Sequence, residues 1–240
     1  LIYKKQSYKL PRNCGRSTAR SFGVGLANYN WLMFAQSNVT LSPNTIYEYL
    51  KVLGTKQCLG WMGKIVYTSF DKLFEDYLNH SSRGINKYTN EVIIDYKYLI
   101  FGNCVVARDI FKTIQIRHSF TGYGGSELDF ASRFNFFFPR TLRCCSRAVV
   151  FRNNHPSFLN QCNRFIEYGK HNFHLLSFTN KKLLLGKLAF FQHFFIMQYC
   201  CVIVLWFCKK IYKCNVFYMN FFVVRAAFLC SIVVGIKKIK

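Results

Sequence analysis

Residues 175–199 read LLSFTNKKLLLGKLAFFQHFFIMQY and admit two incompatible interpretations, which imply different folds. In the first, the polar and basic residues 177–182 form an exposed turn, and the apolar residues after them enter a buried core. In the second, the same apolar residues begin a membrane span, because a span needs about 20 mainly apolar residues. The rest of the chain has to decide between the two.

The charge of the chain is strongly unbalanced. Its 240 residues include 33 Lys and Arg but 10 Asp and Glu, which gives a formal net charge of +23. No acidic residue precedes Glu48 or follows Glu167, so both ends are purely cationic. Such an excess opposes compaction and indicates a polyanionic partner, either nucleic acid or an acidic lipid surface. A solvated basic face, the ordinary explanation of one charged run, accounts less well for a whole-chain excess.

Hydrophobic patterning in the first half of the chain predicts alternating helices and strands. Apolar residues make up 51% of the sequence, which is enough for a folded core. Gly54 follows one amphipathic run and is a typical helix stop. The predicted elements are helix 26–36, strand 39–41, helix 46–53, a bent strand or strand pair at 60–67, strand 91–98 and its partner at 104–106.

The second half is predicted to be rich in strands. Alternation continues through residues 110–123 until Gly122, Gly124 and Gly125 interrupt it. Residues after this point are loosely patterned apart from a helix at 156–168, and they are interpreted as an insertion.

The predicted fold class is α+β, with an N-terminal α/β layer domain followed by a β-rich C-terminal domain with basic extensions. The predicted boundaries are a basic arm at 1–21, the α/β domain at 22–109, the β-rich domain at 110–207 with an insertion at about 124–172, and an apolar and basic extension at 208–240.

Motifs for catalysis or metal binding are absent from the sequence. The eleven cysteines include no CxxC pair, and the six histidines form no HExxH motif. No GxSxG elbow or phosphate-binding loop occurs either. We therefore expect reduced cysteines, no enzymatic activity, no metal ion and no cofactor.

Two stretches combine cations, hydroxyls and aromatic rings, the side chains that contact phosphates, sugars and unpaired bases in RNA. Ordinary solvated strand edges would show the same composition, so each stretch has a second explanation. The candidate RNA-binding residues are Lys112, Arg117, His118, Ser119, Thr121 and Tyr123 in the first stretch, and Ser177, Thr179, Asn180, Lys181 and Lys182 in the second.

A membrane hairpin is the rival interpretation of the C-terminal region. Residues 188–208 and 215–236 each approach the length of a span and are separated by the basic run 209–213. Arg225 lies near the middle of the second segment and would cost about 2.5–3.5 kcal/mol to insert. Enrichment in Val, Ile, Phe and Cys suits a buried core equally well.

The chain contains, in this order, runs at 26–36, 39–41, Ser42-Pro43-Asn44, the helix to Leu53, Gly60-Trp61-Met62, 91–99, Val105, 111–114, 117–123 and 176–189. Together these runs resemble the family of the eighth protein of the small ribosomal subunit. The most specific is 176–189, which resembles the family's Ser-Thr-Ser-Lys-Gly turn and the helix start after it. Departures are the missing Pro-Gly of the basic loop and the replacement of acidic residues by Leu185, Gly186 and Lys187.

The resemblance implies that Ser177, Thr179 and Asn180 contact small-subunit rRNA, with Lys181 and Lys182 beside them. It also implies that residues 197–207 form a closing strand. The expected function is a structural constituent of the mitochondrial small ribosomal subunit, which binds rRNA and supports subunit assembly and translation. The expected partners are the rRNA and neighbouring ribosomal proteins in the matrix.

Composition adds a prediction about origin. The chain has 26 Phe and 15 Tyr but only 4 Pro, a bias typical of an AT-rich organellar genome, so we expect it to be encoded in the organelle. The alternative function is an organelle-encoded membrane protein with a C-terminal helical hairpin, an accessory subunit of a respiratory complex.

Overall fold

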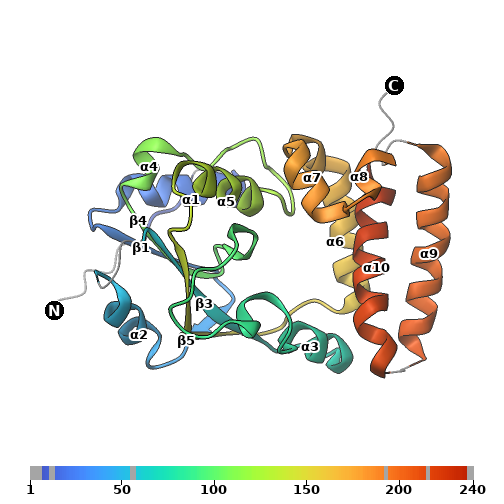
Figure 1. The fold of residues 1–240 in the computed structure, drawn as a ribbon, viewed down its shortest axis with the longest axis horizontal. Coiled ribbons are helices and arrows are strands. Elements are labelled where there is room, and N and C mark those ends of the chain that lie inside the picture. The colour runs from blue at the N-terminus through green and yellow to red at the C-terminus, as the bar shows by residue number, and fades with distance from the viewer. Residues whose placement is uncertain (1–6, 11–13, 55–57, 192–193, 215–216, 237–240) are drawn as a thin grey trace.

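The computed structural model describes residues 7–10, 14–54, 58–191, 194–214 and 217–236. Within them the fold combines helices with one five-stranded sheet, as the α+β prediction requires. Figure 1 shows the sheet and its covering helices in one half of the molecule and a group of helices in the other.

The sheet has the strand order β1-β4-β3-β5-β2. Strands β3 and β5 run parallel, and the remaining neighbours are antiparallel. Every residue of β4 is buried, as its run of small and β-branched side chains predicts for an inner strand. The strands are β1 (Trp31–Ala35), β2 (Val39–Leu41), β3 (Gly60–Tyr67), β4 (Asn103–Ala107) and β5 (Leu142–Arg152).

A buried polar node lies beside the irregularity in the pairing of β3 with β5. The register of β3 on β5 shifts between Gly63 and Lys64. Asn103 is fully buried there; its Nδ2 donates to the carbonyls of Lys64 and Ala148, each at 2.9 Å, and its Oδ1 accepts from the Tyr49 hydroxyl at 2.9 Å. A Cβ at Gly63 would clash with the Tyr49 hydroxyl and the Asn103 amide, so the node requires glycine.

Helices cover both faces of the sheet. Tyr49 and Val52 of α2 (Thr45–Val52) pack with Trp61 and Val105 on one face. On the other, Phe130 belongs to the cluster packed by α5. The remaining helices of this half are α1 (Gly15–Leu26), α3 (Lys72–Asn79), α4 (Ile110–Thr113) and α5 (Ser126–Phe137), with 3-10 turns at Gly84–Lys87 and Tyr96–Tyr98.

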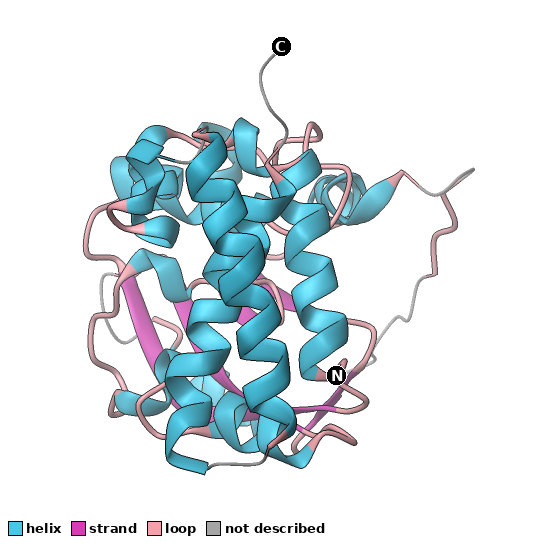
Figure 2. Ribbon diagram, turned by 90° about the vertical axis from the view of Figure 1, so that its right-hand side faces the viewer, coloured by secondary structure: helices cyan, strands magenta, loops and turns pink. Residues whose placement is uncertain are grey.

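The C-terminal region is helical. Helix α10 packs against both α6 and α9, and Figure 2 shows these helices in front of the sheet. A Cβ at Gly169 of α6 or Gly235 of α10 would meet the backbone of the other helix, so the two backbones are in direct contact. The helices are α6 (Phe158–His171), α7 (Phe178–Leu185), α8 (Leu188–Phe191), α9 (Phe195–Lys213) and α10 (Phe217–Gly235), with a 3-10 turn at Phe173–Leu175.

Asp71 joins the helical region to the sheet region. Its Oδ1 accepts the Phe74 N–H at 3.2 Å and so caps α3, while Oδ2 accepts the Phe158 N–H at the start of α6 at 3.0 Å. The Tyr212 hydroxyl near the end of α9 donates to the same carboxylate. One side chain therefore ties together three helices.

Several local predictions are confirmed. Strand 39–41 is β2, the helix at 46–53 is α2 with Gly54 at φ +81° just after it, and the helix at 156–168 is α6. The stretch at 60–67 is one continuous strand, β3, whose register with β5 shifts between Gly63 and Lys64.

Other predictions in the first half are wrong. Residues 31–35 are strand β1, because pairing with β4 outweighs a weak helical pattern, and residues 15–21 of the expected arm belong to α1. The segment 91–98 forms one bridge, at Ile93, and then a 3-10 turn. Residues 1–6 and 11–13 of the arm lie outside the described residues.

The β-rich character expected of 110–207 is also wrong, because β5 is the strand found in its described part. Residues 110–123 form the short α4 and a loop, and 197–207 belong to helix α9. The expected insertion at 124–172 contains β5, which lies between β3 and β2 inside the sheet. Its apolar run is a sheet core strand whose partners are distant in the sequence.

The segments of the expected membrane hairpin form α8, α9 and α10. None of the helices in the described ranges combines the length and the apolar character needed to cross a bilayer.

Candidate nucleic-acid interface

A cleft lies where the sheet region meets the helical region. Its volume is about 570 Å³, and a cavity of about 280 Å³ adjoins it. Segments distant in the sequence form its wall, from the start of α1 to α10. We call it the junction cleft; its principal wall residues are Arg16, Tyr67, Arg83, Lys97, Tyr98, Tyr123, Glu127, Arg152, His155, Gln161, Phe165, Arg225 and Phe228.

The cleft is strongly cationic. Four arginines and Lys97 line it, whereas Glu127 is the single acid among its described wall residues, and Glu127 is already paired with Arg20 at 2.8 Å. Lys97 pairs with Asp95 at 2.8 Å. In the described part of the chain no ion pair engages the wall arginines, which are Arg16, Arg83, Arg152 and Arg225.

Aromatic rings, in place of carboxylates, lie against all four of these arginines. The guanidinium carbon of Arg225 lies 5.7 Å from the centre of the Phe221 ring. The guanidinium carbons of Arg83 and Arg152 each lie 5.9 Å from the centre of the Tyr67 ring. That of Arg16 lies 5.4 Å from the centre of the Tyr123 ring. A ring attracts and orients a cation without neutralising its charge. The arginines are therefore positioned and still able to attract an anion.

The sheet places part of this wall. Tyr67 and Arg152 are register partners at the ends of the parallel strands β3 and β5. Ligands of open sheets commonly bind beyond the carboxyl ends of parallel strands. The Arg152 carbonyl accepts the Thr68 N–H at 3.0 Å, which holds the two chains together just beyond the strand pair.

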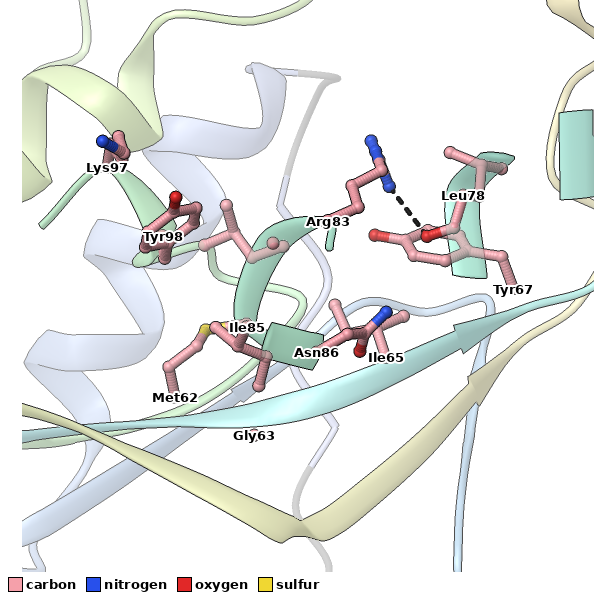
Figure 3. Close-up of a pocket in the computed structure, with 12 residues that line it drawn as sticks. Met62, Gly63, Ile65, Tyr67, Leu78, Arg83, Ile85, Asn86, Lys97 and Tyr98 are labelled. Carbon is pink, nitrogen blue, oxygen red and sulfur yellow. Dashed lines mark hydrogen bonds between the residues drawn. The ribbon is translucent and has the colours of Figure 1, made fainter. Parts of the chain in front are cut away.

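The smaller cavity has an apolar floor and a cationic rim. Figure 3 shows Met62 and Ile85 low in the cavity and Arg83, Lys97 and Tyr98 around it. Nη1 of Arg83 donates to the Leu78 carbonyl at 3.1 Å, the contact dashed in Figure 3. This bond ties the arginine to the end of α3.

His155 forms a neutral part of the wall. It is buried beside the Tyr67 and Phe74 rings, with centre-to-centre distances of 5.1 and 5.5 Å. Burial, and secondly the charge of Arg152, lowers the pKa of His155 to about 4. The imidazole is therefore uncharged at pH 7 and does not add to the positive potential of the cleft.

Most of the first predicted stretch lies outside the cleft. Lys112 is exposed and pairs with Asp109 at 2.7 Å, and Arg117 pairs with the buried Asp129 at 3.1 Å. Both cations can still meet a phosphate, but each already has an acidic partner. Their attraction for a polyanion is correspondingly reduced.

The other residues of this stretch divide between surface and cleft. Ser119 and Thr121 are exposed, and His118 Nδ1 lies 3.1 Å from the Thr18 hydroxyl. Tyr123 lines the junction cleft, and among the described wall residues it is the one that sequence analysis identified.

The second stretch forms the first turn of α7. Ser177 caps this helix, its hydroxyl accepting the Asn180 N–H at 3.3 Å. Asn180 is 1% exposed, so its expected contact with RNA is corrected: the side chain packs inside the protein. Thr179 remains exposed.

The two lysines of α7 lie against aromatic rings. Lys181 Nζ is 5.8 Å from the Phe173 ring centre, and Lys182 Nζ is 5.9 Å from that of Phe190. The next residues of α7, Leu183 and Leu184, line the cleft. The two lysines therefore directly precede residues of the cleft wall on the same helix. They form a basic surface beside the cleft.

Sequence analysis missed Arg16, Arg83, Arg152 and Arg225 because they come from α1, a loop, β5 and α10 and share no local pattern. Tyr67 and Arg152 could have been noticed, since each is the last residue of a strand, where a site residue is often found.

The described residues contain no cluster of three or more His, Cys, Asp or Glu side chains suited to a metal ion. No known protein family matches the sequence, and no curated protein is significantly similar to it.

Proposed function

We propose that this protein is a non-enzymatic RNA-binding component of a ribonucleoprotein, with the junction cleft and the basic surface of α7 as its RNA interface. The observation that carries the proposal is the set of four wall arginines without carboxylate partners in the described chain, each of them beside an aromatic ring. The net charge of +23 supports a large polyanion as partner, because a small acidic ligand needs few cations.

RNA fits this interface better than duplex DNA. A groove that combines cations with aromatic rings is typical of proteins that bind unpaired nucleotides, because phosphates meet the cations and bases meet the rings. Duplex DNA keeps its bases stacked and offers mainly phosphates. The rings of Tyr98 and Phe165 on the cleft wall would then have no free base to stack on.

The specific setting that we propose is the small subunit of a mitochondrial ribosome. There the protein would position rRNA and support subunit assembly and translation beside neighbouring ribosomal proteins. The outer face of α9 supports a crowded assembly, since Ile196, Tyr199, Trp206 and Phe207 are each more than half exposed, at 52–76%. Large exposed apolar patches are usually covered by a partner.

The proposal is tested by RNA binding at several salt concentrations. The double variant Arg83→Ala with Arg152→Ala should bind structured RNA about tenfold more weakly and with a shallower salt dependence, because each lost phosphate contact removes about 0.7–0.9 from the log–log slope. Lys51→Ala is the matched control, since Lys51 lies on α2 and pairs with Glu48. Unchanged affinity and slope in the double variant would contradict the cleft as the interface.

A companion variant tests the flanking surface. Lys181→Ala with Lys182→Ala should weaken RNA binding by a smaller factor, because these residues lie beside the cleft. Fractionation of organelles separates the ribosomal setting from the respiratory alternative. A ribosomal component sediments with the small subunit and its rRNA, whereas a subunit of a membrane complex stays in carbonate-washed membranes.

A further inference from the structure

A buried glutamine in the wall of the junction cleft has an unused acceptor. Gln161 on α6 is 5% exposed and lines the cleft. Its Nε2 donates to the Tyr123 hydroxyl at 2.6 Å. Its Oε1 has no hydrogen-bond partner within the described ranges. Nearly all buried side-chain acceptors in proteins are paired, so this one points to a ligand that supplies a donor.

The loop opposite Gln161 is held firmly against α6. Asn172 Nδ2 donates to the carbonyls of Tyr123 and Gly124, at 3.2 and 3.0 Å. Together with the Gln161–Tyr123 bond, these contacts fix the position of the Tyr123 ring in the wall. The unpaired oxygen of Gln161 therefore belongs to a preorganised part of the cleft.

The chemistry of the wall distinguishes a base from a phosphate. An amide oxygen repels phosphate oxygens but accepts an N–H, which every nucleobase carries on its Watson–Crick edge. Phosphates instead match Arg83 and Arg152. The flat rings of Tyr98 and Phe165 supply surfaces on which a base can stack.

We propose that the junction cleft takes a single unpaired RNA base, which donates an N–H to Gln161 Oε1 while its flanking phosphates contact Arg83 and Arg152. This inference rests on the proposed RNA binding and specifies its ligand. The cleft volume of about 570 Å³ is in the range of pockets that hold one small ligand, about 300–1,000 Å³. A base within a duplex cannot enter, because its Watson–Crick edge is already paired.

The test compares two probes on the full-length protein: a six-residue single-stranded RNA and the same ribose-phosphate chain without bases. The wild type should bind the RNA about tenfold more tightly than the base-free chain. Gln161→Met, which keeps the length of the side chain but removes its amide, should reduce that preference to about threefold or less. Affinity for the base-free chain and its salt dependence should not change.

Tyr123→Phe is the control variant. It removes the same Gln161–Tyr123 hydrogen bond but leaves the Gln161 oxygen in place, so it should keep most of the preference for bases. Circular dichroism and thermal melting establish that both variants are folded. If Gln161→Met melts before binding can be measured, the wild-type comparison of the two probes and Tyr98→Leu, which removes a stacking ring, decide the question.

Equal affinity of the wild type for the two probes would overturn the inference, as would an undiminished preference in a folded Gln161→Met protein. A structured duplex RNA serves as a third probe and separates the two proposals. Salt-dependent duplex binding with no preference for bases leaves the proposed function standing and refutes the base site. Failure to bind any of the three probes refutes both.

Discussion

The sheet region and the helical region of this protein are stabilised in different ways. The sheet region is fixed by backbone pairing along five strands and by the polar node of Tyr49 and Asn103. The helical region depends on side-chain packing, on the close contact of Gly169 with Gly235, and on Asp71. The junction cleft lies between the two. The shape of the cleft therefore depends on the few contacts that hold the helical region in place.

Loss of the Asp71 carboxylate should have the largest effect. Asp71→Ala removes the cap of α3 and the acceptor for the Phe158 N–H and the Tyr212 hydroxyl. Hydrogen bonds to charged groups contribute about 1.5–3 kcal/mol each, so the free energy of unfolding should fall by about 3–5 kcal/mol. Denaturant unfolding measures the loss. Asp76→Ala, an exposed neighbour on α3, should cost less than about 0.5 kcal/mol.

Hydrogen exchange of the same variant sharpens the comparison. Amides of α6 and α9 should lose protection while those of β3 and β4 keep theirs, because the sheet does not depend on this carboxylate. Equal loss of protection in both regions would show that they unfold as one unit. It would contradict the view that the two regions are stabilised in different ways.

Overpacking at the contact between α6 and α10 should have the second effect in size. Gly235→Ala places a methyl group against the Ile166 carbonyl of α6, and the helices must separate to accept it. Overpacking of this kind costs about 1–3 kcal/mol. Gly23→Ala is the matched control, because a Cβ there meets nothing within 4 Å and alanine favours a helix. Thermal melting should show a lower midpoint for the first variant and an unchanged or higher one for the second.

Acidification should have an effect of about the same size as that of Gly235→Ala, through His155 at the junction. Its pKa is about 4 in the folded protein, below the 6.5 of the free side chain. The unfolded chain therefore binds this proton first, so the contribution of His155 to stability is fully present well above pH 6.5 and is lost as the pH drops from 6.5 towards 4. Linkage gives a loss of about 2 kcal/mol between pH 7 and pH 5. Denaturant unfolding at the two pH values measures it, and a His155→Gln protein with the same slope would contradict the assignment.

The sequence predicts the parts of this fold that local patterns determine. The helix before Gly54, the strand at Val39–Leu41 and the helix at α6 all carry their signals within a few residues. Strand β5 could not be placed, because its partners β3 and β2 are distant in the chain. Residues 31–35 satisfied a helical pattern, and pairing with β4 made them a strand.

The candidate site was less accessible to sequence analysis than the fold. Tyr123 was identified because it follows a basic and hydroxyl-rich stretch. Arg16 and Arg225 lie near opposite ends of the sequence, on α1 and α10, and both line the cleft. Asn180 looked like a surface residue by composition, but helix packing buries it. Composition predicts the chemical class of the partner, and only the fold identifies which cations converge.

The rings that hold the wall arginines also bear on the speed of binding. A cation paired with a carboxylate has to exchange partners when a phosphate arrives, and that exchange adds a barrier. Arg83 and Arg152 beside Tyr67 keep their orientation without such a partner, so an incoming phosphate displaces water and counterions alone. For the proposed RNA ligand, association would then be steered by the electric field of the cleft, and added salt would lower the association rate constant.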